Sequence, residues 1–108
     1  MKKLDKKLPQ MLKAIDELYY EEKDKDKKEQ LGIYHKNLSE KLDEVSRAKF
    51  DKNDKFYRGV IQKFKQTEES IEKFKVKQLK ITELFSYLAN LAEQLDALLF
   101  RWNRAEKS

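Results

Sequence analysis

The sequence has no cysteine, a single proline and only two glycines in 108 residues. Without cysteine, the chain has no disulfides, no thiolate metal sites and no cysteine nucleophile. Because glycine and proline form the corners of turn-rich β folds, their scarcity argues against that class of structure. The one histidine, His35, would lack partners for a histidine-based metal site. These absences favour an all-α fold, and we expect neither a metal nor a cofactor.

Long apolar runs are also missing. No apolar segment approaches the roughly 20 residues that are needed to span a bilayer. The start, MKKLDKK, is basic, but Asp5 and further lysines come before any apolar run, which is unlike a Sec signal peptide. The sequence therefore predicts a soluble, cytoplasmic protein without a membrane span, and the missing cysteine fits a reducing compartment.

What the chain does contain is charge and helix-forming residues. Charged residues make up 42% and hydrophobic residues 39%, and the abundance of lysine, glutamate, leucine and glutamine is typical of long helices. The formal net charge is +5. The basic excess lies in residues 57–80, where seven basic residues stand against three acidic ones.

A hydrophobic repeat runs through the second half of the chain. Steps of three and four residues from Tyr57 to Trp102 meet apolar side chains at twelve of fourteen positions, and no glycine or proline interrupts residues 60–108. Such a 3.5-residue repeat indicates one long helix, from about residue 55 to about residue 105, with a coiled-coil-like seam.

The first half is less regular. One apolar stripe runs from Leu4 to Leu18, residues 21–30 carry no apolar side chain, and a second stripe runs from Leu31 to Val45. Either one helix spans about residues 3–49 with a polar middle, or two helices meet near residues 21–32.

Together the two halves predict a single helical domain, folded as an antiparallel helical hairpin or coiled-coil-like bundle. Arm one would cover about residues 3–49, the turn residues 50–56 and arm two about residues 57–105. In this hairpin, residues 8–20 would lie beside roughly residues 86–98, and residues 31–45 beside roughly residues 61–75.

The second arm carries a further row of leucines. Leu84, Leu91 and Leu98 adjoin the main seam, and a two-stranded hairpin cannot bury both rows. Either the N-terminal helix folds back to give a three-helix bundle, or two or more hairpins, identical or different, assemble into a bundle of four or more helices. The second alternative predicts a partner interface at Leu84, Leu88, Leu91, Leu95, Leu98, Phe100 and Trp102. The leading hypothesis is a non-enzymatic adaptor, chaperone or assembly subunit that binds partner helices.

Two short patterns invite a chemical interpretation, and geometry argues against both. His35, Ser39 and Asp43 would point outward in parallel from one helix, whereas a hydrolase triad converges on one point. Residues 51–54 resemble the start of an EF-hand, but the later ligand positions hold lysine, phenylalanine and glutamine. We therefore expect no catalytic and no metal-binding residues.

The basic segment 58–80 supports an alternative function, nucleic-acid binding. Its lysines interleave with Phe64 and Phe74, and a basic block binds phosphates without sequence preference. The residues that would contact phosphate are Lys63, Lys65, Lys73, Lys75, Lys77 and Lys80. Both phenylalanines occupy seam positions, however, so we expect them in the core and rank this function second.

The stretch FDKNDKFYRG, residues 50–59, predicts the corner between the arms. Asn53 or Asp54 would cap the long helix, which is worth about 1 kcal/mol, and Tyr57 would open its seam. Gly59 would cost about 1 kcal/mol within the first turn. We therefore expect another group to pack close to the backbone at Gly59.

Tyr57-Arg58-Gly59 lies near the middle of the chain. This motif resembles that of the small Trp-x-Gly helical-hairpin proteins of type VII secretion and of the small helical partners of LXG-domain toxins, with tyrosine in place of tryptophan. The resemblance implies hairpins that pair into four-helix bundles. It also implies a secretion substrate, a targeting factor or a toxin chaperone.

Overall fold

The computed structural model describes residues 4–107, and within them it contains five α-helices and no strand. The prediction of an all-α fold is confirmed. The helices are α1 (Leu4–Glu21), α2 (Lys25–Ser39), α3 (Leu42–Arg47), α4 (Lys55–Lys75) and α5 (Ile81–Lys107). Among these residues no helix is both long and apolar enough to cross a bilayer.

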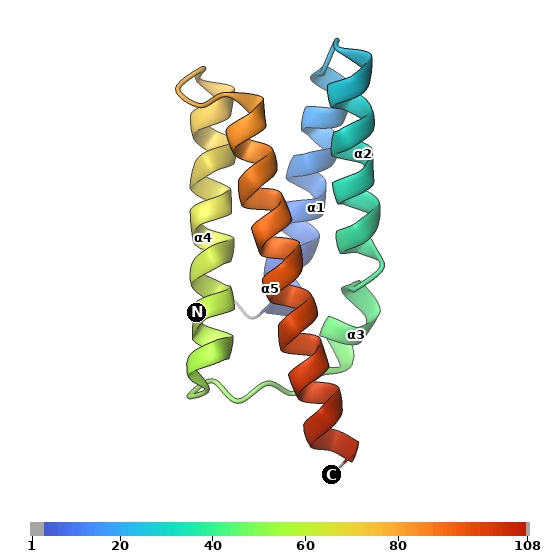
Figure 1. The fold of residues 1–108 in the computed structure, drawn as a ribbon, viewed down its shortest axis with the longest axis vertical. Helices are drawn as coiled ribbons and strands as arrows, with labels where there is room; N and C mark the ends of the chain where they lie inside the picture. The colour runs from blue at the N-terminus through green and yellow to red at the C-terminus, as the bar shows by residue number, and fades with distance from the viewer. Residues whose placement is uncertain (1–3, 108) are drawn as a thin grey trace.

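Four long helices form an elongated bundle of 47 × 22 × 19 Å, and the short α3 continues α2 (Figure 1). α1 packs antiparallel on α2, and α4 packs antiparallel on α5, so that each pair is a local hairpin. The two hairpins meet along two parallel seams, α1 beside α4 and α2 beside α5. We call the end that holds residues 22–24 and 76–80 the upper end, and the end crossed by residues 48–54 the lower end.

The first arm consists of two long helices, as one of the two alternatives predicts. The buried positions of α1 repeat with helical spacing, from Leu4 through Leu8 and Ile15 to Leu18. The polar stretch that follows has nothing to bury, so the chain leaves the bundle and turns at residues 22–24. Asp24 then starts α2, because its carboxylate accepts the backbone N–H groups of residues 26 and 27.

The prediction of one long helix from residue 55 to residue 105 is wrong. α4 ends at Lys75, and Lys77 takes the left-handed conformation, with φ of 62°. Its N–H donates to the carbonyl of Phe74 at 3.0 Å, and the N–H of Gln78 donates to the carbonyl of Lys73 at 2.7 Å. These two bonds form a Schellman motif that ends the helix. The physical reason is burial, because a straight helix would leave the second leucine row uncovered, whereas the fold-back packs α5 on α4.

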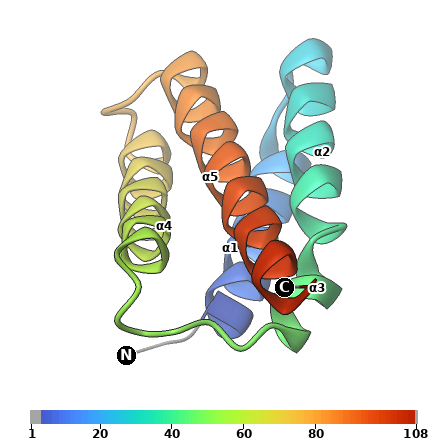
Figure 2. The same cartoon turned by 60° about the horizontal axis from the view of Figure 1, so that its bottom comes forward.

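The predicted pairing of residues 8–20 with 86–98 and of residues 31–45 with 61–75 is also wrong. α1 packs on α2, α3 and α4, and α2 packs on α5. Each arm has its own break, so each arm folds on itself, and the antiparallel contacts form within an arm. The contacts between arms are the two parallel seams, and residues 48–54 cross the lower end from α3 to α4 (Figure 2).

The core runs along the axis of the bundle and draws on all five helices. Its largest fully buried side chains include Phe64 together with the leucines of α1, α2 and α5. Two polar side chains of α4, Thr67 and Ser70, are also buried, and their hydroxyls donate to the carbonyls of residues 63 and 67 at 2.8 and 2.6 Å. Their polar groups are therefore satisfied inside the helix, which removes the cost of burying them.

Candidate protein-interaction site

The predicted partner interface lies mostly inside the molecule, and this corrects the prediction. Leu84, Leu88, Leu91 and Leu95 are fully buried, and Leu98 is nearly so. The cover comes from the other helices of the same chain, which form a four-helix bundle without a second copy. The second leucine row needed another helix, as expected, but α1 and α2 of this chain supply the cover.

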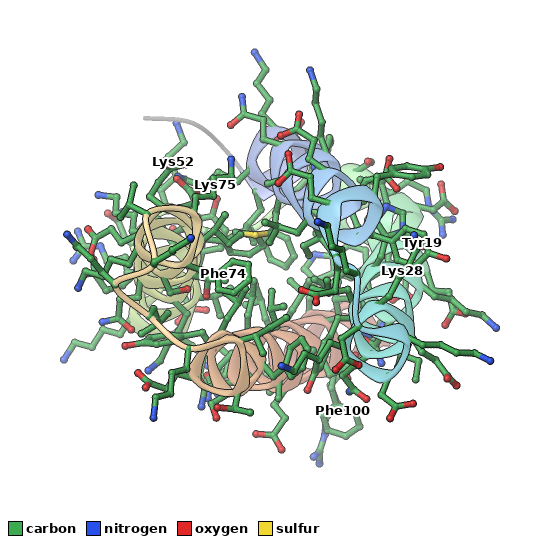
Figure 3. All side chains as sticks on the ribbon, turned by 90° about the horizontal axis from the view of Figure 1, so that it is seen from above. Tyr19, Lys28, Lys52, Phe74, Lys75 and Phe100 are labelled. Carbon is green, nitrogen blue, oxygen red and sulfur yellow. The ribbon has the colours of Figure 1, made fainter. Side chains whose placement is uncertain are left out.

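Phe100 is the exception among the seven predicted interface residues. Its side chain is 64% exposed and points away from the bundle (Figure 3). Trp102, two residues further along α5, is half-buried. Of the predicted partner-binding face on the second arm, only the last turns of α5 are therefore accessible to a partner.

A surface groove with a volume of ≈ 680 Å³ lies between α3 and the end of α5. We call it the Phe100 groove. It is lined by Glu44, Arg47, Phe100, Trp102, Asn103 and Arg104. Figure 2 shows why these residues meet, since the end of α5 lies next to α3 at the lower end of the bundle.

Polar contacts hold α3 and the end of α2 against α5. The Nζ of Lys41 lies 3.1 Å from Oδ1 of Asp96, and the side chain of Lys41 is mostly buried. Asn103 donates a hydrogen bond of 3.4 Å from Nδ2 to Oε2 of Glu44. Val45 of α3 is buried in the core. These contacts hold α3 and α5 in fixed positions relative to each other. The protein therefore loses less conformational entropy when a partner binds in the groove.

Trp102 packs against a small cluster of aromatic rings at the lower end. The ring of Phe50 stacks on Tyr57 with centroids 5.3 Å apart and meets the ring of Trp102 edge-on at 6.4 Å. The guanidinium of Arg101 lies 4.8 Å from the ring centroid of Phe56. A smaller hollow of ≈ 350 Å³ adjoins this cluster and shares Trp102 with the Phe100 groove.

The predicted turn residues take distinct positions. Asp54 caps α4, since its Oδ1 accepts the N–H of Phe56 at 3.1 Å, and it also pairs with Arg101 at 3.8 Å. Asn53 is not the cap, because its own N–H donates to Asp51. Tyr57 is buried at the start of the α4 seam. Arg58 is exposed on α4.

Within the described part of this chain, no group packs close to Gly59, so the expected contact is not an intramolecular one. A Cβ built on Gly59 would meet nothing within 4 Å, and the residue is exposed. Gly32 differs, because a Cβ there would lie 3.4 Å from Cε2 of Tyr19. The open space at Gly59 means that packing does not require glycine at that position.

The six lysines of the basic segment do not gather on one phosphate-binding face. Lys63 is half-buried, Lys65 and Lys73 line a groove between α1 and α4, and Lys77 and Lys80 lie in the upper turn. Lys75 is 4.0 Å from Glu17 and 3.8 Å from Glu72. Phe64 is fully buried and Phe74 partly buried, so neither offers a free ring for base stacking.

A further large groove lies between α1 and α4. Its volume is ≈ 650 Å³, its floor is formed by Met11, Ala14 and Ile71, and its rim carries both acidic and basic side chains. Within the part of the chain that the structure describes, no three His, Cys, Asp or Glu side chains come together as a metal site would need. Ser39 donates to the carbonyl of Lys36 and Asp43 pairs with Arg47, so both are engaged locally.

Sequence reasoning missed the α3 side of the Phe100 groove. Glu44 and Arg47 are far from Phe100 in sequence, and no periodicity joins them. Phe50 stood within the predicted turn, and its aromatic character was the one signal that this turn packs against something. The pairing of α3 with the end of α5 arises only from the fold.

Comparison with known proteins identifies no family model that matches the chain, and no curated protein or solved structure that is similar to it.

Proposed function

We propose that the protein is a non-enzymatic helical interaction protein that binds a partner protein through the Phe100 groove. The observation that carries the proposal is the exposure of Phe100, at 64%, beside a half-buried tryptophan. Burying an exposed phenylalanine side chain is worth about 1.5–3 kcal/mol. A partner that covers Phe100 gains this free energy on binding, because the ring is exposed to water in the chain alone.

The composition of the groove supports the same proposal. Tryptophan and arginine are enriched among the residues that dominate interface energies, and this groove contains Trp102, Arg47 and Arg104. Two aromatic and four polar residues line the groove, and such a mixture of apolar and polar groups is usual at protein interfaces. A groove beside a helix also fits the recognition of a partner helix by its apolar face.

Adaptor, chaperone and assembly subunit all remain consistent with this surface. If the resemblance of Tyr57-Arg58-Gly59 to the Trp-x-Gly proteins holds, the partner would be a helical segment of a secreted toxin. Nucleic-acid binding through the basic segment has weaker support, because its lysines are dispersed and its phenylalanines are covered.

Site-specific cross-linking tests the proposal. A photo-reactive phenylalanine analogue is placed at position 100 of the full chain, and at position 87 as a matched control. Tyr87 lies on the same helix and is 41% exposed, but it is about 20 Å away along the axis at 1.5 Å per residue. In the producing cells we expect a discrete protein adduct from position 100 and none from position 87. Equal labelling at the two positions, or no adduct at position 100, would contradict the proposal.

A further inference from the structure

We infer that the Phe100 groove takes an acidic amphipathic peptide segment, whose apolar side chains cover Phe100 and Trp102 and whose carboxylates meet Arg47 and Arg104. This inference rests on the proposed function and adds the chemistry of the partner. It is carried by the distribution of charge and by which charged groups the chain already pairs.

The two ends of the bundle differ in charge. Residues 4–7, 41–58 and 96–104, which form the lower end, contain ten basic and six acidic residues. Residues 16–30 and 69–83, which form the upper end, contain eight basic and ten acidic residues. This basic excess at the lower end is distinct from the basic segment 57–80, of whose basic residues only Arg58 belongs to the lower end.

The carboxylates around the groove already have partners within the chain. Glu44 accepts the hydrogen bond of Asn103, Asp51 accepts the N–H of Asn53, and Asp54 caps α4 and pairs with Arg101. Each of these contacts places a hydrogen-bond donor or a cation beside the carboxylate and offsets part of its negative field. They reduce the repulsion of an incoming carboxylate but do not remove it, since Glu44 and Asp51 stay exposed.

The cations of the groove are much less engaged. Arg104 and Lys49 are exposed, and neither makes a hydrogen bond or an ion pair with any described residue. Arg47 pairs with Asp43 at 3.0 Å, with the two side chains 69% and 81% exposed, and its Nε donates to the carbonyl of the same residue at 3.4 Å. Pairs of this kind exchange readily with other anions, since their net value in water is small. Two arginines can each bind a carboxylate with two parallel hydrogen bonds.

A peptide fits this surface better than a nucleic acid. A nucleic-acid strand presents closely spaced phosphates and binds through a continuous basic track. Here Glu44, Asp51 and Asp54 interrupt the basic residues on the same surface. An amphipathic peptide avoids this conflict because it can place two carboxylates opposite the arginines and apolar side chains between them.

Peptide selection tests the inference. A display library of helix-forming peptides with random surface positions is selected against the full chain and counter-selected against Phe100→Ala. We expect the Phe100-dependent peptides to be enriched in Asp and Glu and to carry net negative charge. Binding of one selected peptide should weaken at least tenfold on Arg104→Glu. Arg58→Glu makes the same change of charge on an exposed part of α4, and there we expect a change of less than twofold.

The outcomes separate the inference from the proposed function. Phe100-dependent peptides that are neutral or basic would overturn the inference and leave the function standing. Selected peptides that bind Phe100→Ala as well as they bind the wild type would overturn both. A labelled 20-nucleotide oligothymidine that binds in a Phe100-dependent manner, without any such peptide, would replace the acidic peptide with a nucleic acid. Circular dichroism of each variant keeps loss of folding distinct from loss of binding.

Discussion

The two ends of the bundle are closed in different ways. At the upper end, two short turns each join neighbouring antiparallel helices, and they are completed by a side-chain cap at Asp24 and by backbone hydrogen bonds at Lys77. At the lower end, residues 48–54 cross the bundle from α3 to α4, and aromatic rings hold that crossing in place. The upper end has an acidic excess, and the lower end has a basic one.

The way in which an end is closed determines whether an exposed groove can form there in so small a bundle. A short turn joins two helices that already pack on each other. No helix then extends beyond its neighbour to form the wall of a groove. At the lower end the crossing begins directly after α3, and α5 extends past α3, so that α3 and the end of α5 form two walls of a groove. The upper end also exposes an aromatic ring, Tyr20, but its ring meets Tyr19 and the ammonium of Lys28 lies 6.0 Å away. Phe100 has no such neighbour among the ring and cation contacts of the described residues.

Leu91→Asp tests whether the bundle is stable without a partner, and among the variants considered it should destabilise the protein most. Leu91 is fully buried, so Leu91→Asp places a charge in the core without a partner, and we expect a loss of at least about 3 kcal/mol in unfolding free energy. Urea unfolding followed by circular dichroism measures it, with Tyr87→Asp as the control on the exposed side of α5. A Leu91→Asp chain that keeps its stability as a monomer would mean that this leucine row faces a partner.

The next effect compares the aromatic rings of the two ends. Phe50→Ala removes a partly buried ring that touches both Tyr57 and Trp102, and we expect a loss of about 1–2 kcal/mol. Tyr20→Ala, at the upper end, removes a ring that is 72% exposed, and its cost should stay within about 0.5 kcal/mol. Thermal and urea unfolding of both variants would measure the difference. Equal costs would mean that the lower aromatic cluster does not brace the crossing.

Much of this fold can be predicted from the sequence, because helical periodicity records which face of each helix is buried. The stripes of α1 and of α4 and α5 identify the core residues, and the polar stretch before Lys25 marks the first break. The second break is invisible for a physical reason. The repeat keeps its phase through residues 76–80, and the position that usually holds glycine in a Schellman motif holds Lys77.

The candidate site is less predictable than the fold. Phe100 is exposed because the other helices cover other rows of α5 side chains. Which rows they cover depends on how the two hairpins pack together, and no local sequence pattern shows it. When the fold-back at Lys77 is missed, Leu84 to Leu98 have no cover within the chain, and a partner must be supposed for them. One unrecognised turn therefore moves the predicted interface from the end of α5 to its buried middle.

Gly59 near the lower end offers a smaller effect of opposite sign. Because a Cβ there meets nothing within 4 Å, Gly59→Ala should raise the free energy of unfolding by about 1 kcal/mol, the difference in helix propensity. Gly32→Ala is the matched control, since its Cβ would lie 3.4 Å from the ring of Tyr19 and should gain less. Destabilisation by Gly59→Ala would restore the idea that a partner or a segment packs against this backbone, as the Tyr-Arg-Gly motif implies.

The smallest expected effect lies in the upper turn, at the residue that stops α4. Lys77 has φ of 62°, where a side chain is strained and glycine is not. Glycine also has more freedom in the unfolded chain, which offsets part of the gain, so Lys77→Gly should stabilise the protein by about 0.5 kcal/mol. Lys73→Gly, one turn earlier on an exposed helical site, should instead cost about 1 kcal/mol. If both variants lose stability equally, residue 77 is helical, α4 and α5 run on as one helix, and the upper end is not a turn at all.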